Sequence, residues 1–274
     1  MDLTAVCQTA QEIAREAGAY LKEGLDQPKA ITRKSSDIDW VTQYDTGSEA
    51  LIRQRLDAAF PDHGFYGEEG GDQTTDSPYV WYVDPIDGTT NFAHGVPFFS
   101  VSLALYENGR PLVGVIYDPM RDEAFHAVAG QGALVTRGGV SKRCWVSKTA
   151  VLTDALFATG FSYDRQQSRK SNVPEVSRFL QVAQGIRRTG SGALDIAYVA
   201  AGRFDGYWEQ RLSCWDMAAG VLLVQEAGGK ATFMDGSPFT IQSEFGLVAS
   251  NGRLHDEMLT IFHETREKEM PSFP

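Results

Sequence analysis

The sequence predicts a mixed α/β fold of the α+β kind, and three observations support this prediction. Apolar residues recur at helical spacing over residues 3–21, which is typical of an amphipathic helix. Short apolar runs separated by turn residues follow over residues 98–128, which is typical of an antiparallel meander. From about residue 151 onward, runs of strand length and helix length alternate. We therefore expect helices on an antiparallel sheet first, and an alternating half second.

Two helices are expected in the first half of the chain, residues 1–142. Asp2 can cap the first of them, which is expected over residues 3–24. The second is expected over residues 45–60, because Pro61 cannot continue a helix. Both helices are expected to pack on the antiparallel sheet.

The strands of the first half are expected to pair as an antiparallel meander. Asn108 and Gly109 predict a two-residue hairpin turn of the primed type between two of these strands. The expected strands cover residues 79–83, 98–106, 112–117 and 123–128. The first of them is apolar throughout, so we expect it to be buried.

The second half, residues 143–274, is expected to be an α/β half of alternating strands and helices. Ser191 can cap a helix that ends just before Gly202. The expected elements, after a start at residues 151–159, are helices over 192–201, 215–227 and 254–267 and strands over 204–208, 230–234 and 247–250. The two halves are expected to form one compact unit.

Composition excludes several classes of protein. The 274 residues include 36 acidic and 25 basic side chains, for a formal net charge of −11. The chain therefore lacks the basic footprint of a protein that binds nucleic acid or an anionic membrane surface. No run of apolar residues is long enough to span a membrane. Three widely spaced cysteines and the lack of a secretory signal favour a reducing, cytoplasmic location.

The segment DPIDGTTNF, residues 84–92, is the most informative part of the sequence. Asp84 and Asp87 follow directly on the expected buried strand, and Pro85 forces the chain to bend there. The bend can aim both carboxylates and the Ile86 carbonyl into one pocket. Oxygen ligands of this kind, without His or Cys, suit a hard cation such as Mg²⁺. The alternative is an Asp-Pro turn in which the aspartates only cap the backbone.

Further residues could complete such a site. The N–H groups of Gly88 and Thr89 would lie at the start of a turn or helix, where an anion binds readily. Glu68 and Glu69 are adjacent in an extended stretch, so at most one of them is expected to face the site. Asp216 stands where a helix begins. The alternatives are a solvated turn for the two glutamates and, for Asp216, a first-turn carboxylate favoured by the helix dipole.

Other common catalytic motifs are absent from the sequence. The five histidines form no pair at zinc-binding spacing, and no G-x-S-x-G nucleophile elbow occurs. The run Gly190-Ser191-Gly192 lacks the third glycine and the strand context of a dinucleotide-binding fingerprint, and there is no P-loop. The sequence therefore favours none of the zinc, serine-nucleophile, dinucleotide or P-loop chemistries.

The motifs, taken in order, resemble those of the inositol monophosphatase family. The matching segments are WYVDPIDGTTNF at 81–92, WDMAAG at 215–220, EAGG at 226–229, Gly-Glu-Glu at 67–69, and the stretch from Lys34 to Asp45. The resemblance covers about residues 3–262. It implies a layered αβαβα sugar-phosphatase fold in which the two halves form one catalytic unit. It also implies dependence on Mg²⁺, with two or three ions per subunit, inhibition by lithium and a homodimer.

The resemblance implies roles for individual residues, carried over by position. The implied metal ligands are Glu68, Asp84, the Ile86 carbonyl, Asp87 and Asp216. The groups implied to position the attacking water are Glu68, Thr89 and Asp45. The groups implied to bind the substrate are Asp87, Gly88, Thr89, Ser191, Gly192 and Glu209, with Lys34 on a mobile loop near the metals.

The expected activity is hydrolysis of inositol 1-phosphate to inositol and phosphate by a metal-activated water. The same chemistry on fructose 1,6-bisphosphate, histidinol phosphate or NADP remains an alternative, because one fold serves many substrates. A regulatory binding protein with residual activity is an alternative of another class. Gly192 and Ser213 depart from the family pattern, in which animal enzymes tend to carry Ala and His, so both positions bear on which ring is bound.

Overall fold

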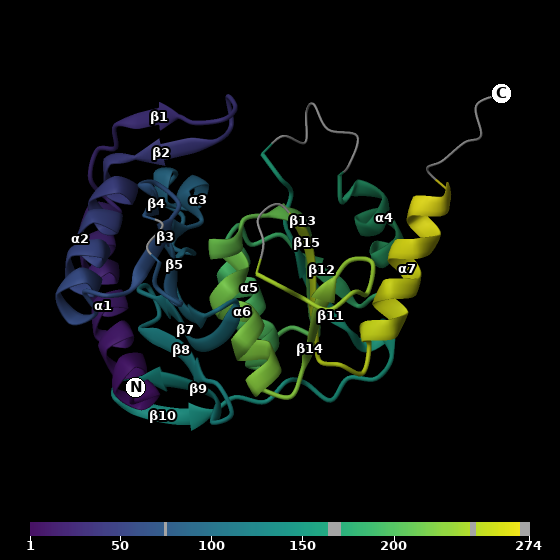
Figure 1. The fold of residues 1–274 in the computed structure, drawn as a ribbon. Coiled ribbons are helices and arrows are strands. Elements are labelled where there is room, and N and C mark those ends of the chain that lie inside the picture. Colours follow the sequence, from purple (N-terminus) through teal and green to yellow (C-terminus); the bar gives the residue numbers. More distant parts are fainter. Residues whose placement is uncertain (74–75, 164–170, 242–244, 269–274) are drawn as a thin grey trace.

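Five layers of secondary structure alternate across the molecule, in the order helices, sheet, helices, sheet, helices (Figure 1). The computed structural model describes residues 1–73, 76–163, 171–241 and 245–268. The layered αβαβα fold implied by the resemblance is therefore confirmed. Among the described helices, none is long and apolar enough to cross a membrane.

The first sheet has eight strands in the order β10-β9-β8-β7-β6-β5-β3-β4. β3 and β5 are parallel, and the other neighbours are antiparallel. Asn108 and Gly109 both have positive φ, 49° and 80°, which confirms the expected primed turn. The strands are β3 (Gly64–Gly67), β4 (Gly71–Gln73), β5 (Tyr79–Asp87), β6 (Ser100–Glu107), β7 (Arg110–Asp118), β8 (Glu123–Val128), β9 (Gly132–Arg137) and β10 (Val140–Arg143).

The second sheet has five strands in the order β12-β11-β13-β15-β14, and a small hairpin stands apart from both sheets. β11 is parallel to β12 and β13, whereas β15 is antiparallel to β13 and β14. The strands are β11 (Leu156–Thr159), β12 (Gly185–Arg187), β13 (Gly206–Leu212), β14 (Lys230–Phe233) and β15 (Phe245–Ser250), and the hairpin is β1 (Ile31–Arg33) with β2 (Trp40–Thr42).

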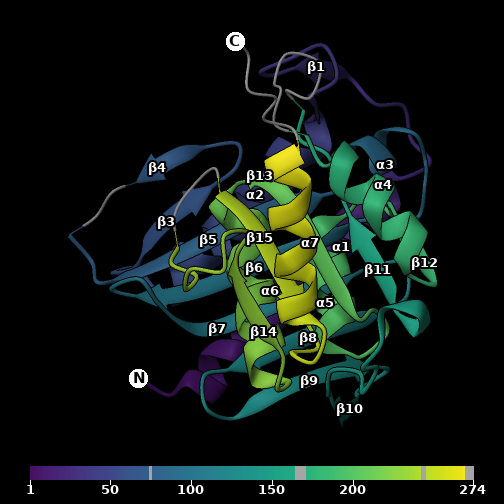
Figure 2. The same cartoon turned by 90° about the vertical axis from the view of Figure 1, so that its right-hand side faces the viewer.

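The helices form the first, third and fifth layers. Figure 1 shows α1 and α2 outside the first sheet and α5 and α6 between the sheets, and Figure 2 shows α7 in front of the second sheet. The outer pair is α1 (Leu3–Gly24) and α2 (Gln43–Ala59), the middle pair is α5 (Gly192–Ala200) and α6 (Cys214–Glu226), and the other outer pair is α4 (Val173–Val182) and α7 (His255–Lys268). The short α3 (Thr89–Ala93) and a 3₁₀ turn (Leu152–Asp154) lie in connections.

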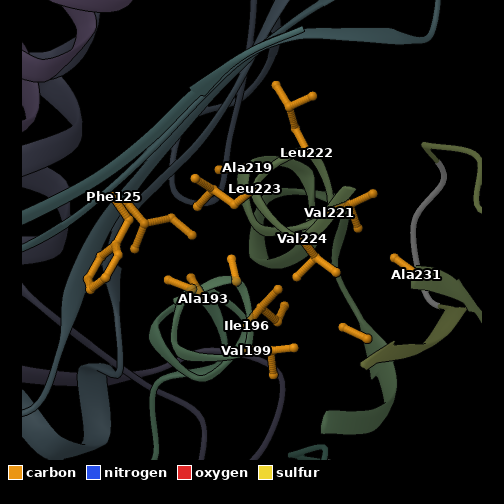
Figure 3. Close-up of a cluster of buried hydrophobic side chains, with 14 of the residues drawn as sticks. Phe125, Ala193, Ile196, Val199, Ala219, Val221, Leu222, Leu223, Val224 and Ala231 are labelled. Atoms are coloured by element: carbon orange, nitrogen blue, oxygen red, sulfur yellow. The ribbon is translucent and has the colours of Figure 1, made fainter. Parts of the chain in front are cut away.

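Burial explains the character of each helix. α1 buries one stripe of residues at spacings of three and four, and Asp2 caps it by accepting the Thr4 and Ala5 N–H groups at 3.0 and 3.2 Å. α6 is buried along residues 217–224 because it has a sheet on each side. In Figure 3 the apolar side chains of the middle helices lie between Phe125 of the first sheet and Ala231 of the second.

Several expected bounds differ from the structure by a few residues; the strand expected over residues 204–208, for example, is β13 (Gly206–Leu212). Two of the corrections bear on function. α2 begins at Gln43 and not at Asp45, because Thr42 caps it and Asp45 lies within its first turn. β5 does not end at Val83 but continues to Asp87, through an irregularity in its pairing with β6. The strands of the first sheet lie within residues 64–143, and a division of the chain at residue 142 stays a prediction.

Candidate active site

A cleft of about 390 Å³ collects the candidate site residues from both sheets and from the middle helices. All the site residues implied by the family resemblance line this cleft, with the exception of Asp45. Asp45 lies directly behind it, because the Thr89 hydroxyl donates a hydrogen bond to Asp45 Oδ1 at 2.8 Å. The lining residues among them are Lys34, Glu68, Asp84, Ile86, Asp87, Gly88, Thr89, Ser191, Gly192, Glu209 and Asp216.

A bulge in β5 brings Asp84 and Asp87 to the same side. The two residues are three positions apart, and in a regular strand that spacing would turn their side chains to opposite faces. Here Asp84 is paired with Ser102 and Asp87 with Ser100, so β5 uses one residue more than β6 between the two pairs. The Ile86 N–H donates to Asp84 Oδ1 at 3.0 Å, which holds the bulge in place. The expected bend at Pro85 is therefore a strand bulge.

The start of α5 holds Asp87. The N–H groups of Gly192 and Ala193 donate to its carboxylate at 3.1 and 2.8 Å. The hydroxyls of Ser100 and Ser191 also donate to Asp87 Oδ2. Ser191 was expected to cap α5 with its side chain, but it makes no such cap because its hydroxyl is directed to Asp87. Burial raises the pKa of Asp87 although these donors oppose the shift.

Asp216 joins this pair from the first turn of α6. The Ser213 N–H donates to Asp216 Oδ2 at 2.7 Å. Asp84, Asp87 and Asp216 each offer a carboxylate oxygen, and these atoms lie within 4.8 Å of one another. Burial raises the pKa of Asp84 and Asp216 well above the usual aspartate range, and the neighbouring carboxylates, including Glu68, raise it further. A buried cluster of oxygen ligands with this mutual repulsion fits a hard divalent cation.

Glu68 lies in the turn after β3, beside the lysine of the β1–β2 hairpin. Lys34 Nζ donates to Glu68 Oε1 at 2.8 Å and also contacts Glu69 Oε1. Burial alone would lower the pKa of Lys34, but the two carboxylates raise it. Glu68 lines the cleft, whereas the Glu69 side chain is only 7% exposed. The pair is therefore not a solvated turn, and one of the two faces the site.

Gly88 and Thr89 form the wall next to the acidic cluster. Gly88 has φ +102°, and a Cβ there would lie 3.0 Å from the Gly190 carbonyl oxygen, so both conformation and space favour glycine. Thr89 Oγ1 lies 2.8 Å from Asp45 Oδ1 and 3.1 Å from the Ile86 carbonyl oxygen. Thr89 thus connects the backbone of the bulge to the first turn of α2.

Asp195 in the cleft and Tyr207 behind it were not identified from the sequence. Asp195 lines the cleft from α5 and is 1% exposed, and Tyr207 lies on β13 with its hydroxyl against Glu209. The sequence positions of both residues could have identified them. Asp195 is one helical turn after Ser191, and Tyr207 is two positions before Glu209 on a strand, so each shares a face with a residue already singled out.

The layered fold and the acidic cleft together define a phosphatase of the layered sugar-phosphatase class. A model of the inositol monophosphatase family matches residues 2–267. The chain therefore belongs to the inositol monophosphatase family, and it is a phosphatase enzyme with an acidic cluster that could bind metal.

Relatives and solved structures agree with this assignment. The inositol-1-monophosphatase of Synechocystis sp. is 40% identical over 258 residues, which cover 94% of this chain and 88% of that protein. The Nus factor SuhB of Pseudomonas aeruginosa is 42% identical over 258 residues, covering 92% of this chain and 93% of that protein. The structure of inositol monophosphatase from Anabaena (Nostoc) sp. PCC 7120 is 41% identical with a TM-score of 0.86, covering 96% of this chain and 97% of that one.

Proposed function

We propose that this protein is a Mg²⁺-dependent phosphomonoesterase that hydrolyses inositol 1-phosphate to inositol and phosphate. The observation that carries the proposal is the convergence of Asp84, Asp87 and Asp216 in one cleft that also contains Glu209. The three aspartates can bind cations that attract a phosphate, and the Glu209 carboxylate can accept hydrogen bonds from the hydroxyls of a polyol. The relatives named inositol-1-monophosphatase support the choice of substrate.

The carboxylates supply a ligand set for two or three Mg²⁺ ions per subunit. The residues that would hold them are Glu68, Asp84, Asp87 and Asp216, together with the Ile86 carbonyl oxygen. Bound Mg²⁺ would neutralise phosphate charge and lower the pKa of a coordinated water. The bulge of β5 and the start of α6 fix the aspartates in place before any ion arrives, so little ordering remains to be done on binding.

Thr89 and Asp45 would position the attacking water and carry its proton. The Thr89 hydroxyl donates to Asp45 and Thr89 lines the cleft, so its oxygen retains lone pairs that can accept a hydrogen bond from a bound water. A proton accepted from water by Thr89 Oγ1 would be matched by transfer of the hydroxyl proton to Asp45. Glu68 would act on the same water as a further acceptor.

The phosphate and the alcohol of the substrate would contact different parts of the cleft, and the alcohol would contact the start of α5 and β13. The N–H groups of Gly88 and Thr89 are proposed to receive the phosphate oxygens. Ser191 and Gly192 line the same cleft beside Asp87, and Glu209 would accept hydrogen bonds from the ring hydroxyls. Lys34 would leave Glu68 when a cation takes its place on that carboxylate.

The test is phosphate release from a panel of esters at fixed Mg²⁺, compared by kcat/KM. The panel contains inositol 1-phosphate, fructose 1,6-bisphosphate, histidinol phosphate and NADP, and we expect inositol 1-phosphate to rank first. Turnover should disappear in excess chelator and in Asp84→Asn, because Asp84 is one of the three aspartates of the cluster. Equal turnover with and without chelator would refute the metal mechanism. If another ester ranks first, that ester would replace inositol 1-phosphate as the proposed substrate.

Three further properties are proposed from the family resemblance. The protein is expected to act as a homodimer in the cytoplasm and to be inhibited by Li⁺, which would compete at a metal position. Light scattering in solution measures the mass, and inhibition curves at several Mg²⁺ concentrations test the competition. A monomer, or inhibition independent of Mg²⁺, would contradict the respective expectation.

A regulatory binding role with residual catalysis is a second candidate, and one observation favours it. Relatives named Nus factor SuhB are as similar to this chain as those named inositol-1-monophosphatase. The two candidates predict different outcomes when Asp84→Asn is expressed in cells whose own copy of this protein has been removed. Full complementation by this inactive variant would favour the regulatory role, and loss of complementation would favour the phosphatase.

A further inference from the structure

We propose that Tyr207 is a positioning residue for the choice of substrate, because its hydroxyl orients the Glu209 carboxylate toward the ring hydroxyls of a polyol phosphate. The inference rests on the proposed function, since it takes a hydroxyl-rich phosphate ester as the substrate. It gives Tyr207 a role in selecting the alcohol and no role in cleaving the phosphate ester.

The strand places the two side chains together. Tyr207 and Glu209 are two positions apart on β13, so they project from the same face. The Tyr207 hydroxyl donates to Glu209 Oε2 at 2.5 Å. Tyr207 is 0% exposed, whereas Glu209 is half-buried and lines the cleft. The tyrosine therefore contacts the carboxylate from the protein interior, on the side away from an entering substrate.

Two glycines leave the space that this arrangement needs. A Cβ at Gly160 would collide with the Glu209 carboxylate. A Cβ at Gly192 would lie 2.8 Å from the Tyr207 hydroxyl oxygen, closer than real Cβ contacts. The carboxylate is thus enclosed by a backbone segment on one side and by the tyrosine hydroxyl on another, so its orientation is fixed before substrate binds.

The chemistry of the pair fits hydroxyl recognition. Burial raises the pKa of Tyr207 well above its usual value, and the carboxylates of Glu209 and Asp195 raise it further, so Tyr207 remains a proton donor. A carboxylate has about four lone-pair positions, so the bond to Tyr207 leaves acceptor capacity for hydroxyls of the substrate. A hydrogen bond to a charged acceptor is also roughly twice as strong as one between neutral groups, which helps to hold the carboxylate in this orientation.

Gly192 separates this role from the metal end of the cleft. Its N–H donates to Asp87 Oδ1 at 3.1 Å, while a Cβ on its α carbon would meet the Tyr207 hydroxyl. Removing the tyrosine hydroxyl leaves the bond from the Gly192 backbone to Asp87 in place. A loss of selectivity without a loss of chemistry is therefore the expected signature of Tyr207.

The experiment compares inositol 1-phosphate with ethyl phosphate, an ester that lacks ring hydroxyls. In Tyr207→Phe we expect kcat/KM for inositol 1-phosphate to fall roughly 10-fold, mainly through a higher KM, as expected for one charge-assisted hydrogen bond. The value for ethyl phosphate should stay the same. Gly160→Ala, whose added methyl would collide with the Glu209 carboxylate and displace it from the Tyr207 hydroxyl, should lower the same preference, and it serves if Tyr207→Phe does not fold.

Two controls separate positioning from structural damage. Tyr106→Phe removes another buried hydroxyl, which donates to the Ala218 carbonyl at 3.0 Å, and should leave the preference between the two esters unchanged. In a Glu209→Gln background, Tyr207→Phe should change the preference by less than about 2-fold, because coupled residues are not additive. Additive effects of the two substitutions would overturn the proposal.

The proposed function and this inference fail in different ways. If the unchanged protein does not prefer inositol 1-phosphate to ethyl phosphate, the polyol substrate is wrong and the role of Tyr207 falls with it. If the unchanged protein has the preference and Tyr207→Phe keeps it, or loses both esters equally, only the inference about Tyr207 is wrong.

Discussion

The starts of α2 and α6 use the same local hydrogen bond in two chemically different surroundings. α2 is capped by Thr42 and carries Asp45 in its first turn, and α6 is capped by Ser213 and carries Asp216 at the same position. In both, Oδ2 of the aspartate accepts the N–H of the capping residue at 2.7 Å. The backbone thus aims one carboxylate at each helix start toward the cleft region.

The two aspartates differ in the groups that surround their carboxylate oxygens. Asp45 meets hydrogen-bond donors, with Thr89 Oγ1 at 2.8 Å on Oδ1 and Thr42 Oγ1 at 2.6 Å on Oδ2. Asp216 meets other carboxylates, Asp84 and Asp87, within the same small cluster. An aspartate among donors is suited to orient a hydroxyl, and one among carboxylates is suited to bind a cation. The same helix-start motif therefore serves two roles, and the neighbours decide which.

Asp216→Asn should have the largest effect on turnover, and it tests whether the aspartate of α6 is a metal ligand. The asparagine oxygen can still accept the Ser213 N–H, so the helix start remains while one charge of the cluster is lost. We expect kcat to fall by about 100-fold or more, since even residues that only support metal ligands often cost 10–100-fold. Phosphate release measures kcat. The midpoint of thermal unfolding in chelator should not fall, and near-normal turnover would contradict a ligand role.

Removing metal should make stability depend on pH in a defined direction. Asp84 and Asp216 have folded-state pKa values raised above those of the unfolded chain, so the metal-free folded protein keeps protons that the unfolded chain has released. Its stability therefore falls as pH rises from the ordinary aspartate pKa, about 4, through the raised values. Mg²⁺ should offset this loss, by about 2.7 kcal/mol at 100 times its Kd.

The measurement is thermal unfolding with and without Mg²⁺ at about pH 6.5 and pH 8. Burial lowers the pKa of His126 and His255 to about 4 in the folded chain, so over this window they affect stability only through the unfolded chain, which titrates near pH 6.5. That contribution is the same with and without Mg²⁺, so it cancels from the stabilisation by Mg²⁺. The stabilisation by Mg²⁺ should be larger at the higher pH. An equal shift at both pH values would contradict the assignment of the cluster as the metal site.

Asp45→Asn should have a smaller effect on turnover than Asp216→Asn. The asparagine amide would direct donors toward groups that already donate, so Thr89 would lose its fixed orientation. We expect kcat to fall about 10-fold, in the range for residues that orient a catalytic group. The Mg²⁺ concentration for half-maximal activity should change little. A shift of that concentration as large as in Asp216→Asn would place Asp45 among the metal ligands instead.

Thr42→Ala should give the smallest effect and sharpen the comparison. Thr42 Oγ1 accepts the Tyr44 N–H at 3.1 Å and donates to Asp45, so its loss removes a helix cap and one support of the aspartate. The free energy of unfolding in urea should fall by about 1 kcal/mol, the usual value for such a cap. Ser213→Ala is the matched change at α6. A loss of turnover larger than that of Asp45→Asn would show that the cap does more than support Asp45.

Much of the fold could be predicted because its signals are local. The bounds of β8, residues 123–128, were predicted as the structure has them, and α1 was predicted with its cap. The β1–β2 hairpin was not predicted, since its three-residue strands are too short to show a periodic pattern. α4 was also missed, although Pro174 in its first turn is typical of a helix start.

The site could be predicted only in part, because its geometry depends on distant partners. Asp84 and Asp87 share a face only through their pairing with Ser102 and Ser100, and nothing within β5 itself specifies that register. Asp216 reaches them from a helix that is more than a hundred residues later in the chain. The bend at Pro85 alone predicted that Asp84 and Asp87 share a pocket suited to a hard cation, whereas Asp216 was joined to them by resemblance to a known family.

The position of the middle helices has a consequence for how the chain is made. α5 and α6 cover the inner face of the first sheet, where Ile116 and Phe125 are buried against them. A ribosome completes β10 at Arg143 well before it reaches these helices, so the apolar face emerges without its cover. Nascent chains that end in this interval should therefore be captured by chaperones more strongly than longer ones, because the layer at the centre of the molecule is synthesised after the sheet that needs it.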